Sequence, residues 1–160
     1  MSRPPHYLSA EEIGQLPERE SQHQFNANAV RLSRTLSEVA GMSRLGVHIV
    51  RLTSGRDSTQ YHYHDNDEEF LYVLSGHGEA RIGDHVIEVG PGDFMGFPCG
   101  SAAHSLHNPH EEDLVYLMAG EGNANDMVHY PDIRKSMVKS AGQRVAANWE
   151  DLEPQAPKKG

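Results

Sequence analysis

The chain of 160 residues has a single cysteine, Cys99, and little positive charge. One cysteine excludes an intramolecular disulfide and is typical of a reducing compartment, so we expect a cytoplasmic protein. Only 14 lysine and arginine residues stand against 23 acidic ones, and the net charge of −9 argues against a nucleic-acid partner. Apolar runs fall well short of the roughly 18 residues of a membrane helix, and the first twenty residues lack a signal-peptide pattern. We therefore expect no association with membranes.

The length allows one sizeable core and is too short for two ordinary domains. We predict an N-terminal arm at residues 1–27, a β-barrel domain at 28–135 and a C-terminal extension at 136–160 with a mobile end from 154 onward. Within the arm, Ser9 and Glu12 have capping-box spacing, and Pro17 ends the short helix that follows.

Turn residues recur every eight to twelve positions after residue 75, with short β-type segments between them. The pair Gly83-Asp84 separates two such segments and predicts a two-residue hairpin, because glycine tolerates the positive φ of such turns. Many short strands without a helical pattern between them indicate an antiparallel sandwich or small barrel. We predict an all-β jelly roll with an interior wide enough for a ligand.

Three histidines and a carboxylate have the spacing of metal ligands. His62 and His64 are two residues apart, so on a strand both side chains point to one face. Glu69 follows a polar turn, and a hairpin there would return it beside His64. His104 opens a later strand and would complete the set. Imidazoles with a carboxylate suit a divalent transition metal such as Zn, Fe, Mn or Ni rather than Mg or Ca.

These residues resemble the two sequence motifs of the cupin superfamily. The first motif is matched by Gly55, His62, His64, Glu69 and Gly76, and the second by Gly92, Pro98, Gly100, His104 and Asn108. The sequence departs from the motifs in two turns, with one extra residue before His62 and one before His104.

Over residues 28–135 the chain looks like the small single-domain bacterial cupins, which often carry only a provisional label as sugar-phosphate isomerases. The resemblance implies an antiparallel double-stranded β-helix, or jelly-roll barrel, and a metal site made by His62, His64, Glu69 and His104.

Three further residues are candidates for the surroundings of the metal. Gln60 shares the strand face of His62 and His64, and Asn108 shares that of His104, so both are candidates to hydrogen bond the ligands. His48 either lines the pocket or is a packed, hydrogen-bonded histidine. On an alternating strand His107 should point away from the site.

Three functions fit a metal-binding cupin. The first is an enzyme, isomerase-like or dioxygenase-like, acting on a small polar molecule such as a sugar, sugar phosphate or carboxylate. The alternatives are a non-catalytic module that binds a metal-anchored small molecule, and a purely structural metal. Near the barrel segments we count Arg51, Arg56 and Arg81 as partners for a phosphate. A homodimer is expected, since cupin-like sheets often pair at an edge.

Overall fold

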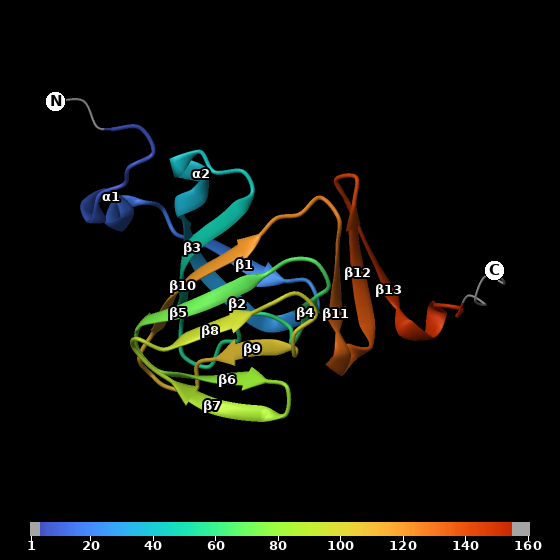
Figure 1. Ribbon diagram of the computed structural model, residues 1–160. Coiled ribbons are helices and arrows are strands. Elements are labelled where there is room, and N and C mark those ends of the chain that lie inside the picture. Colours follow the sequence, from blue (N-terminus) through green and yellow to red (C-terminus); the bar gives the residue numbers. More distant parts are fainter. Residues whose placement is uncertain (1–3, 155–160) are drawn as a thin grey trace.

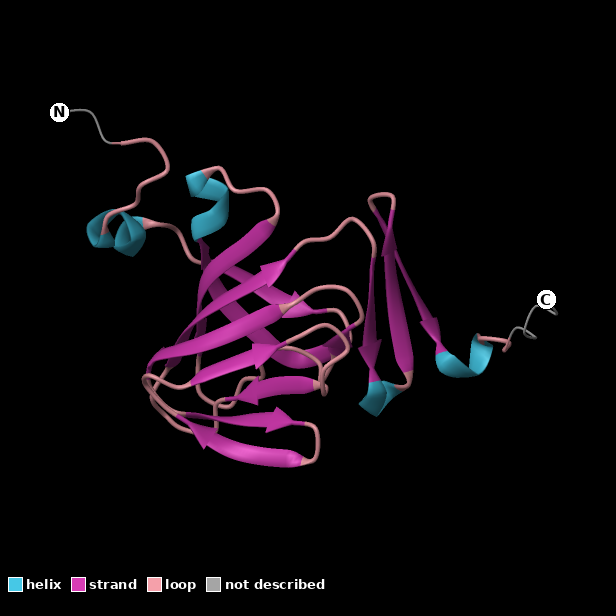
Figure 2. Cartoon of the chain, in the orientation of Figure 1, coloured by secondary structure: helices cyan, strands magenta, loops and turns pink. Residues whose placement is uncertain are grey.

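The computed structural model describes residues 4–154, and its main elements are antiparallel strands in three sheets (Figures 1 and 2). The largest sheet has the order β1 (Arg19–His23), β2 (Asn26–Thr35), β3 (Leu45–Leu52), β10 (Leu114–Glu121), β5 (Glu69–Ser75), β8 (Phe94–Phe97). A second sheet has the order β7 (His85–Val89), β6 (Gly78–Ile82), β9 (His104–His107). The third has the order β13 (Gln143–Asn148), β12 (Lys135–Ser140), β11 (Asp126–Tyr130), β4 (Tyr63–His64).

The helical segments are short. They are α1 (Ala10–Gln15), α2 (Leu36–Ala40) and the 3₁₀ turns Pro131–Ile133 and Trp149–Asp151. Ser9 and Glu12 form the predicted capping box of α1. Among the described residues no helix is long and apolar enough to cross a membrane.

The core lies between the large sheet and the β6–β7–β9 sheet. Its fully buried side chains include Val50, Leu52, Leu106, Leu114 and Tyr116, which come from β3, β9 and β10. Strands β3, β5 and β10 alternate between side chains that face this core and side chains that face away, as expected when one face of a sheet is buried. The predicted all-β jelly-roll class is confirmed.

Of the two predicted hairpins, one is confirmed. The hairpin between β6 and β7 turns at Gly83 with φ of 56°. The predicted hairpin between His64 and Glu69 is wrong, because β4 pairs with β11 whereas β5 pairs with β10 and β8. The polar turn between them carries the chain from one sheet to another.

The two ends of the barrel domain are continuous with its sheets. Strand β1, within the predicted arm, pairs along β2, and Glu18 binds Arg51 of β3 with an N–O distance of 2.6 Å. After residue 135, β12 and β13 form a hairpin that extends the β11 sheet, with the Trp149 indole donating to Ser136 Oγ. The division at residues 27 and 135 stays a prediction, and most of the predicted mobile end lies outside the described residues.

Candidate metal centre

The four predicted ligands come from parts of the chain that the sheets bring together. His64 lies in β4, Glu69 is the first residue of β5, and His104 is the first residue of β9, so each of the three sheets contributes one. His62 lies just before β4 and forms a bridge with His104, in which each backbone N–H donates to the other residue's carbonyl. The bridge fixes the two imidazoles side by side, with ring centroids 4.6 Å apart.

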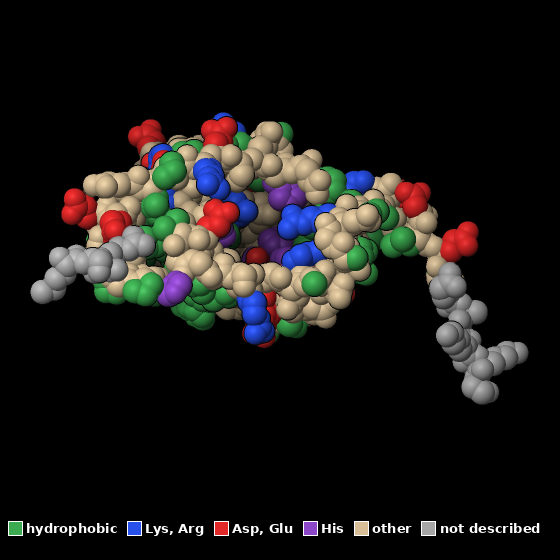
Figure 3. Space-filling model, turned by 90° about the horizontal axis from the view of Figure 1, so that it is seen from above, with side chains coloured by type: hydrophobic (Ala, Val, Ile, Leu, Met, Phe, Trp, Pro, Cys, Tyr) green, Lys and Arg blue, Asp and Glu red, His purple; other side chains and the backbone are tan. Residues whose placement is uncertain are grey.

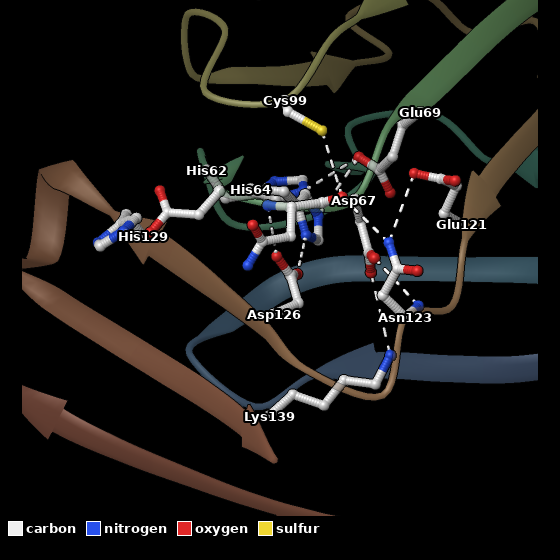
Figure 4. A network of polar contacts seen from close by, with 12 residues as sticks. His62, His64, Asp67, Glu69, Cys99, Glu121, Asn123, Asp126, His129 and Lys139 are labelled. Carbon is white, nitrogen blue, oxygen red and sulfur yellow. Dashed lines mark hydrogen bonds and ion pairs between the residues drawn. The ribbon is translucent and has the colours of Figure 1, made fainter.

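All three imidazoles turn Nε2 toward one carboxylate oxygen of Glu69. Figure 4 shows His62 and His64 beside the Glu69 carboxylate. Glu69 Oε2 is 3.2 Å from His104 Nε2, 3.4 Å from His62 Nε2 and 3.5 Å from His64 Nε2. Two donors that each bind one transition ion at ~2.0–2.2 Å are themselves roughly 3.0–3.5 Å apart. Each of the three distances fits a pair of ligands on one ion, and the ligand atoms of His62, Glu69 and His104 all lie within 4.8 Å of one another.

The other ring nitrogens hold two of these imidazoles in orientation. His62 Nδ1 lies 3.0 Å from the Gln60 carbonyl oxygen, and His64 Nδ1 lies 2.6 Å from Asp126 Oδ2. A hydrogen bond from Nδ1–H to such an acceptor leaves the lone pair of Nε2 free for a metal. His104 is oriented differently, by stacking on the Phe97 ring with centroids 3.5 Å apart.

Burial and hydrogen bonding set the charge of the centre. Burial raises the pKa of the Glu69 carboxyl, but hydrogen bonds from His104 and His62 and the nearby imidazoles hold it well below its usual value. Burial lowers the pKa of His104, against the opposing effect of Glu69. The arrangement thus favours the carboxylate form of Glu69 and the neutral form of His104, which are the forms that bind a metal.

Asp126 is a functional candidate that sequence reasoning missed. Its side chain is 1% exposed, and its second oxygen accepts the Asn66 backbone N–H. Burial raises the pKa of the Asp126 carboxyl, but hydrogen bonds from His64 and Asn66 outweigh burial and lower it. His64, Asp67 and Asp126 also have ligand atoms within 4.8 Å of one another. We assign Asp126 to orienting His64, since their hydrogen bond uses Nδ1 and leaves Nε2 facing Glu69.

Of the three residues predicted to surround the metal, one lies beside the candidate ligands and two lie elsewhere. Gln60 lies beside the site, where the carbonyl, rather than the predicted side chain, contacts His62. Asn108 is not brought to the site, because its amide donates to the Leu52 and Glu112 carbonyls and braces a loop. His48 is not brought there either and lies beside Thr35 Oγ1 at 3.1 Å.

His107 points away from the site, as predicted, and pairs with Asp57.

The candidate ligands line a cavity of about 340 Å³. Leu71, Met118 and Val128 form apolar parts of its wall. Tyr116 also lines it, and its hydroxyl is buried without a hydrogen-bond partner among residues 4–154. A buried hydroxyl of this kind is available to a bound ligand, since leaving it unpaired costs free energy.

A larger hollow of about 470 Å³ adjoins the other side of Glu69. It is lined by Phe70, Phe94 and Leu45 among others and by none of the three histidines. We therefore place the functional site in the smaller cavity, where the donor atoms converge.

The comparisons with known proteins agree with this geometry. The family described as "Cupin domain" matches residues 48–120, and no curated protein matches the chain.

Two solved structures are similar over nearly the whole chain. One, from Acidithiobacillus ferrooxidans, is named provisionally as a sugar phosphate isomerase; it is 34% identical with a TM-score of 0.93, and the match covers 96% of this chain and 98% of that one. The other, from Silicibacter pomeroyi, is named as a sugar phosphate isomerase from a cupin superfamily; it is 25% identical with a TM-score of 0.78, covering 94% and 96%. A predicted oxalate decarboxylase from Thermotoga maritima, 17% identical with a TM-score of 0.58 over 68% of this chain and 95% of that one, shares the fold.

Proposed function

The chain belongs to the cupin superfamily as a small single-domain cupin, and from that premise we propose that it is a metal-dependent enzyme of the isomerase type. Its substrate would be a small molecule with hydroxyl and carbonyl groups, such as a sugar or sugar phosphate. The observation that carries the proposal is the convergence of three imidazole Nε2 atoms on Glu69 Oε2 in the wall of a cavity.

We propose His62, His64, Glu69 and His104 as the ligands of one divalent transition ion, Zn, Fe, Mn or Ni. When bound, the ion would supply Lewis-acid chemistry that polarises a substrate carbonyl or hydroxyl oxygen. The mixed nitrogen and carboxylate donors suit these metals.

Around the ion, the chain's own residues would bind and orient the substrate. The Tyr116 hydroxyl can donate to a substrate oxygen, since it has no partner among the described residues. Burial raises the pKa of the neighbouring Tyr130 hydroxyl to about 12, which keeps it protonated as a second donor. The names of the two similar structures support a sugar-like substrate.

The test begins with metal content. The purified chain is stripped with a chelator, reloaded separately with Zn, Fe, Mn and Ni, and assayed for interconversion of aldoses and ketoses, free and phosphorylated. His62→Ala should abolish both binding of the ion and turnover. His85→Ala, at an exposed position on β7, is the matched control and should change neither.

Metal removal should also lower the melting temperature. Free ion at 100 times its Kd adds about 2.7 kcal/mol to the free energy of unfolding, which for this chain length corresponds to roughly 5–10 °C. Bound metal without turnover on any substrate would reject the enzyme. If the loaded protein then bound small polyols saturably, the non-catalytic binding module would replace it.

We also propose a homodimer formed through free sheet edges. Strands β7 and β8 end their sheets, and Val86, Ile87 and Phe94 on them are exposed by 46–64%. Apolar side chains along unpaired edges favour pairing with another copy. Sedimentation equilibrium is the test, and a monomer at micromolar concentration would reject it.

A further inference from the structure

Two cavities share one wall next to the candidate metal centre. The first is the 340 Å³ cavity of the ligands, and the second, of about 320 Å³, lies between the β1–β2 and β12–β13 hairpins. Arg31 and Arg144 line both. Seen from above in Figure 3, histidine and cationic side chains gather round a hollow at the centre of the molecule. Neither Arg31 nor Arg144 is among the arginines that the sequence suggested for a phosphate.

Arg31 lies in β2 and is half-buried. Its Nη1 is 3.6 Å from Met118 Sδ, and within residues 4–154 it forms no ion pair. Nearby arginines behave differently, since Arg34 and Arg51 both bind Glu18. Arg31 thus has a charge that its own strand neighbours do not neutralise.

Arg144 approaches the same wall from β13. No carboxylate in the described part of the chain lies within ion-pair distance of it. Its cross-strand partner Lys139 also lines the metal cavity, but that ammonium lies 3.9 Å from Asp67 Oδ2. Two guanidinium groups from separate hairpins therefore flank the cavity with their charge available.

The negative net charge of the chain gives meaning to the lack of carboxylate partners for Arg31 and Arg144. In a chain of net charge −9, carboxylates are plentiful, yet none pairs with either guanidinium within the described residues. Arg31 is a half-buried cation, which is costly unless it meets an anion, and guanidinium forms short, charge-assisted hydrogen bonds to phosphate oxygens. A ligand that spans the cavity would bring such an anion.

We propose that Arg31 and Arg144 bind the phosphate group of the substrate while its oxygen-rich end faces the metal centre. The assignment of that other end rests on the proposed function, whereas the phosphate subsite stands on the two arginines alone. The inference narrows the substrate to a phosphorylated small molecule.

The test uses inorganic phosphate as the probe and isothermal titration calorimetry of the full chain, both metal-loaded and chelator-treated. Arg31→Gln and Arg144→Gln should each raise the Kd for phosphate about tenfold or more, through loss of charge-assisted hydrogen bonds. Arg44→Gln, an exposed arginine outside both cavities, should leave it unchanged. Because Arg144 is exposed, its variant reports on binding even where the Arg31 variant folds poorly.

The outcomes separate this inference from the proposed function. Phosphate binding that the chelator abolishes and both variants retain would place the anion on the ion and overturn the subsite. Acetate binding as tightly as phosphate would overturn the assignment to phosphate. Phosphate binding that depends on the arginines in a chain that binds no metal would support the subsite and reject the metal-dependent enzyme.

Discussion

Gly120 lies directly opposite Glu69 in the ladder between β10 and β5. A Cβ atom at Gly120 would come 3.1 Å from Glu69 Cγ and 3.3 Å from Glu69 Oε1. The absence of a side chain at this position therefore leaves the room in which the Glu69 carboxylate turns toward the histidines.

Gly120→Ala should weaken metal binding, because the added methyl group displaces the Glu69 carboxylate by a few tenths of an ångström. We expect the Kd for Zn or Ni to rise about tenfold, as for other disturbances of ligand orientation, measured by competition with a chromogenic chelator. Gly14→Ala, where an added Cβ meets no atom within 4 Å, is the control. Equal affinity of both variants would contradict the assignment of Glu69 as a ligand.

Asp126→Asn should weaken metal binding by about 10–100-fold, because it removes the carboxylate that orients His64. The matched control is Asp65→Asn, which alters a carboxylate beside His129, an imidazole outside the candidate ligand set. Titration of both variants with the metal measures the two Kd values to be compared. If the control loses as much affinity as Asp126→Asn, the effect comes from net charge rather than from orientation.

Stability of the metal-free chain should fall as the pH drops from about 6.5 toward 4. Burial, with the charges of His62 and Arg31, lowers the pKa of His23 to about 4, below the unfolded value of about 6.5. In this window the unfolded chain takes up the proton more readily, so the free energy of unfolding decreases as the pH falls.

Urea titrations in chelator at several pH values measure this slope, and His23→Gln should reduce it. His85→Gln is the control for replacing an exposed histidine. A slope that His23→Gln leaves intact would assign the pH dependence to other groups.

Gly76→Ala should destabilise the fold more than Gly55→Ala. Both glycines have positive φ, 72° and 73°, which costs an alanine about 1 kcal/mol. A Cβ at Gly76 would also overlap the carbonyl oxygen of Asp113, whereas at Gly55 it meets nothing within 4 Å. The overlap should add about 1–3 kcal/mol, which urea unfolding of the two variants measures. Equal losses would show that the backbone conformation alone explains both glycines.

Sequence reasoning reached the parts of the fold that depend on local chemistry. The Gly83 turn and the Ser9 cap each follow from a short pattern whose physical cause lies within a few residues. The path between His64 and Glu69 does not, because a polar turn can return the chain to its own sheet or carry it to another. The path depends on pairing with strands distant in sequence, because β5 pairs with β10 and β4 pairs with β11.

The candidate site divides in the same way. Motif spacing singled out Glu69 and the three histidines whose Nε2 atoms the structure turns toward it. Asp126 and Arg144 were missed because the pairing of β11 with β4 and of β12 with β13 brings them to the cavity. Asn108 was misplaced because strand alternation predicts a face but cannot show that backbone carbonyls already occupy the amide.

Each of the three sheets contributes one candidate ligand, and this affects how the sheets can open locally. An ion held by His64, Glu69 and His104 would cross-link the three sheets, in addition to their packing, their loops and the bridge between His62 and His104. Separation of any one layer would then first require release of the ion, so β4, β5 and β9 should open as a single cooperative unit. Their amide hydrogens would gain protection against exchange together when metal is added, while β1, at the far edge of the large sheet, would gain less.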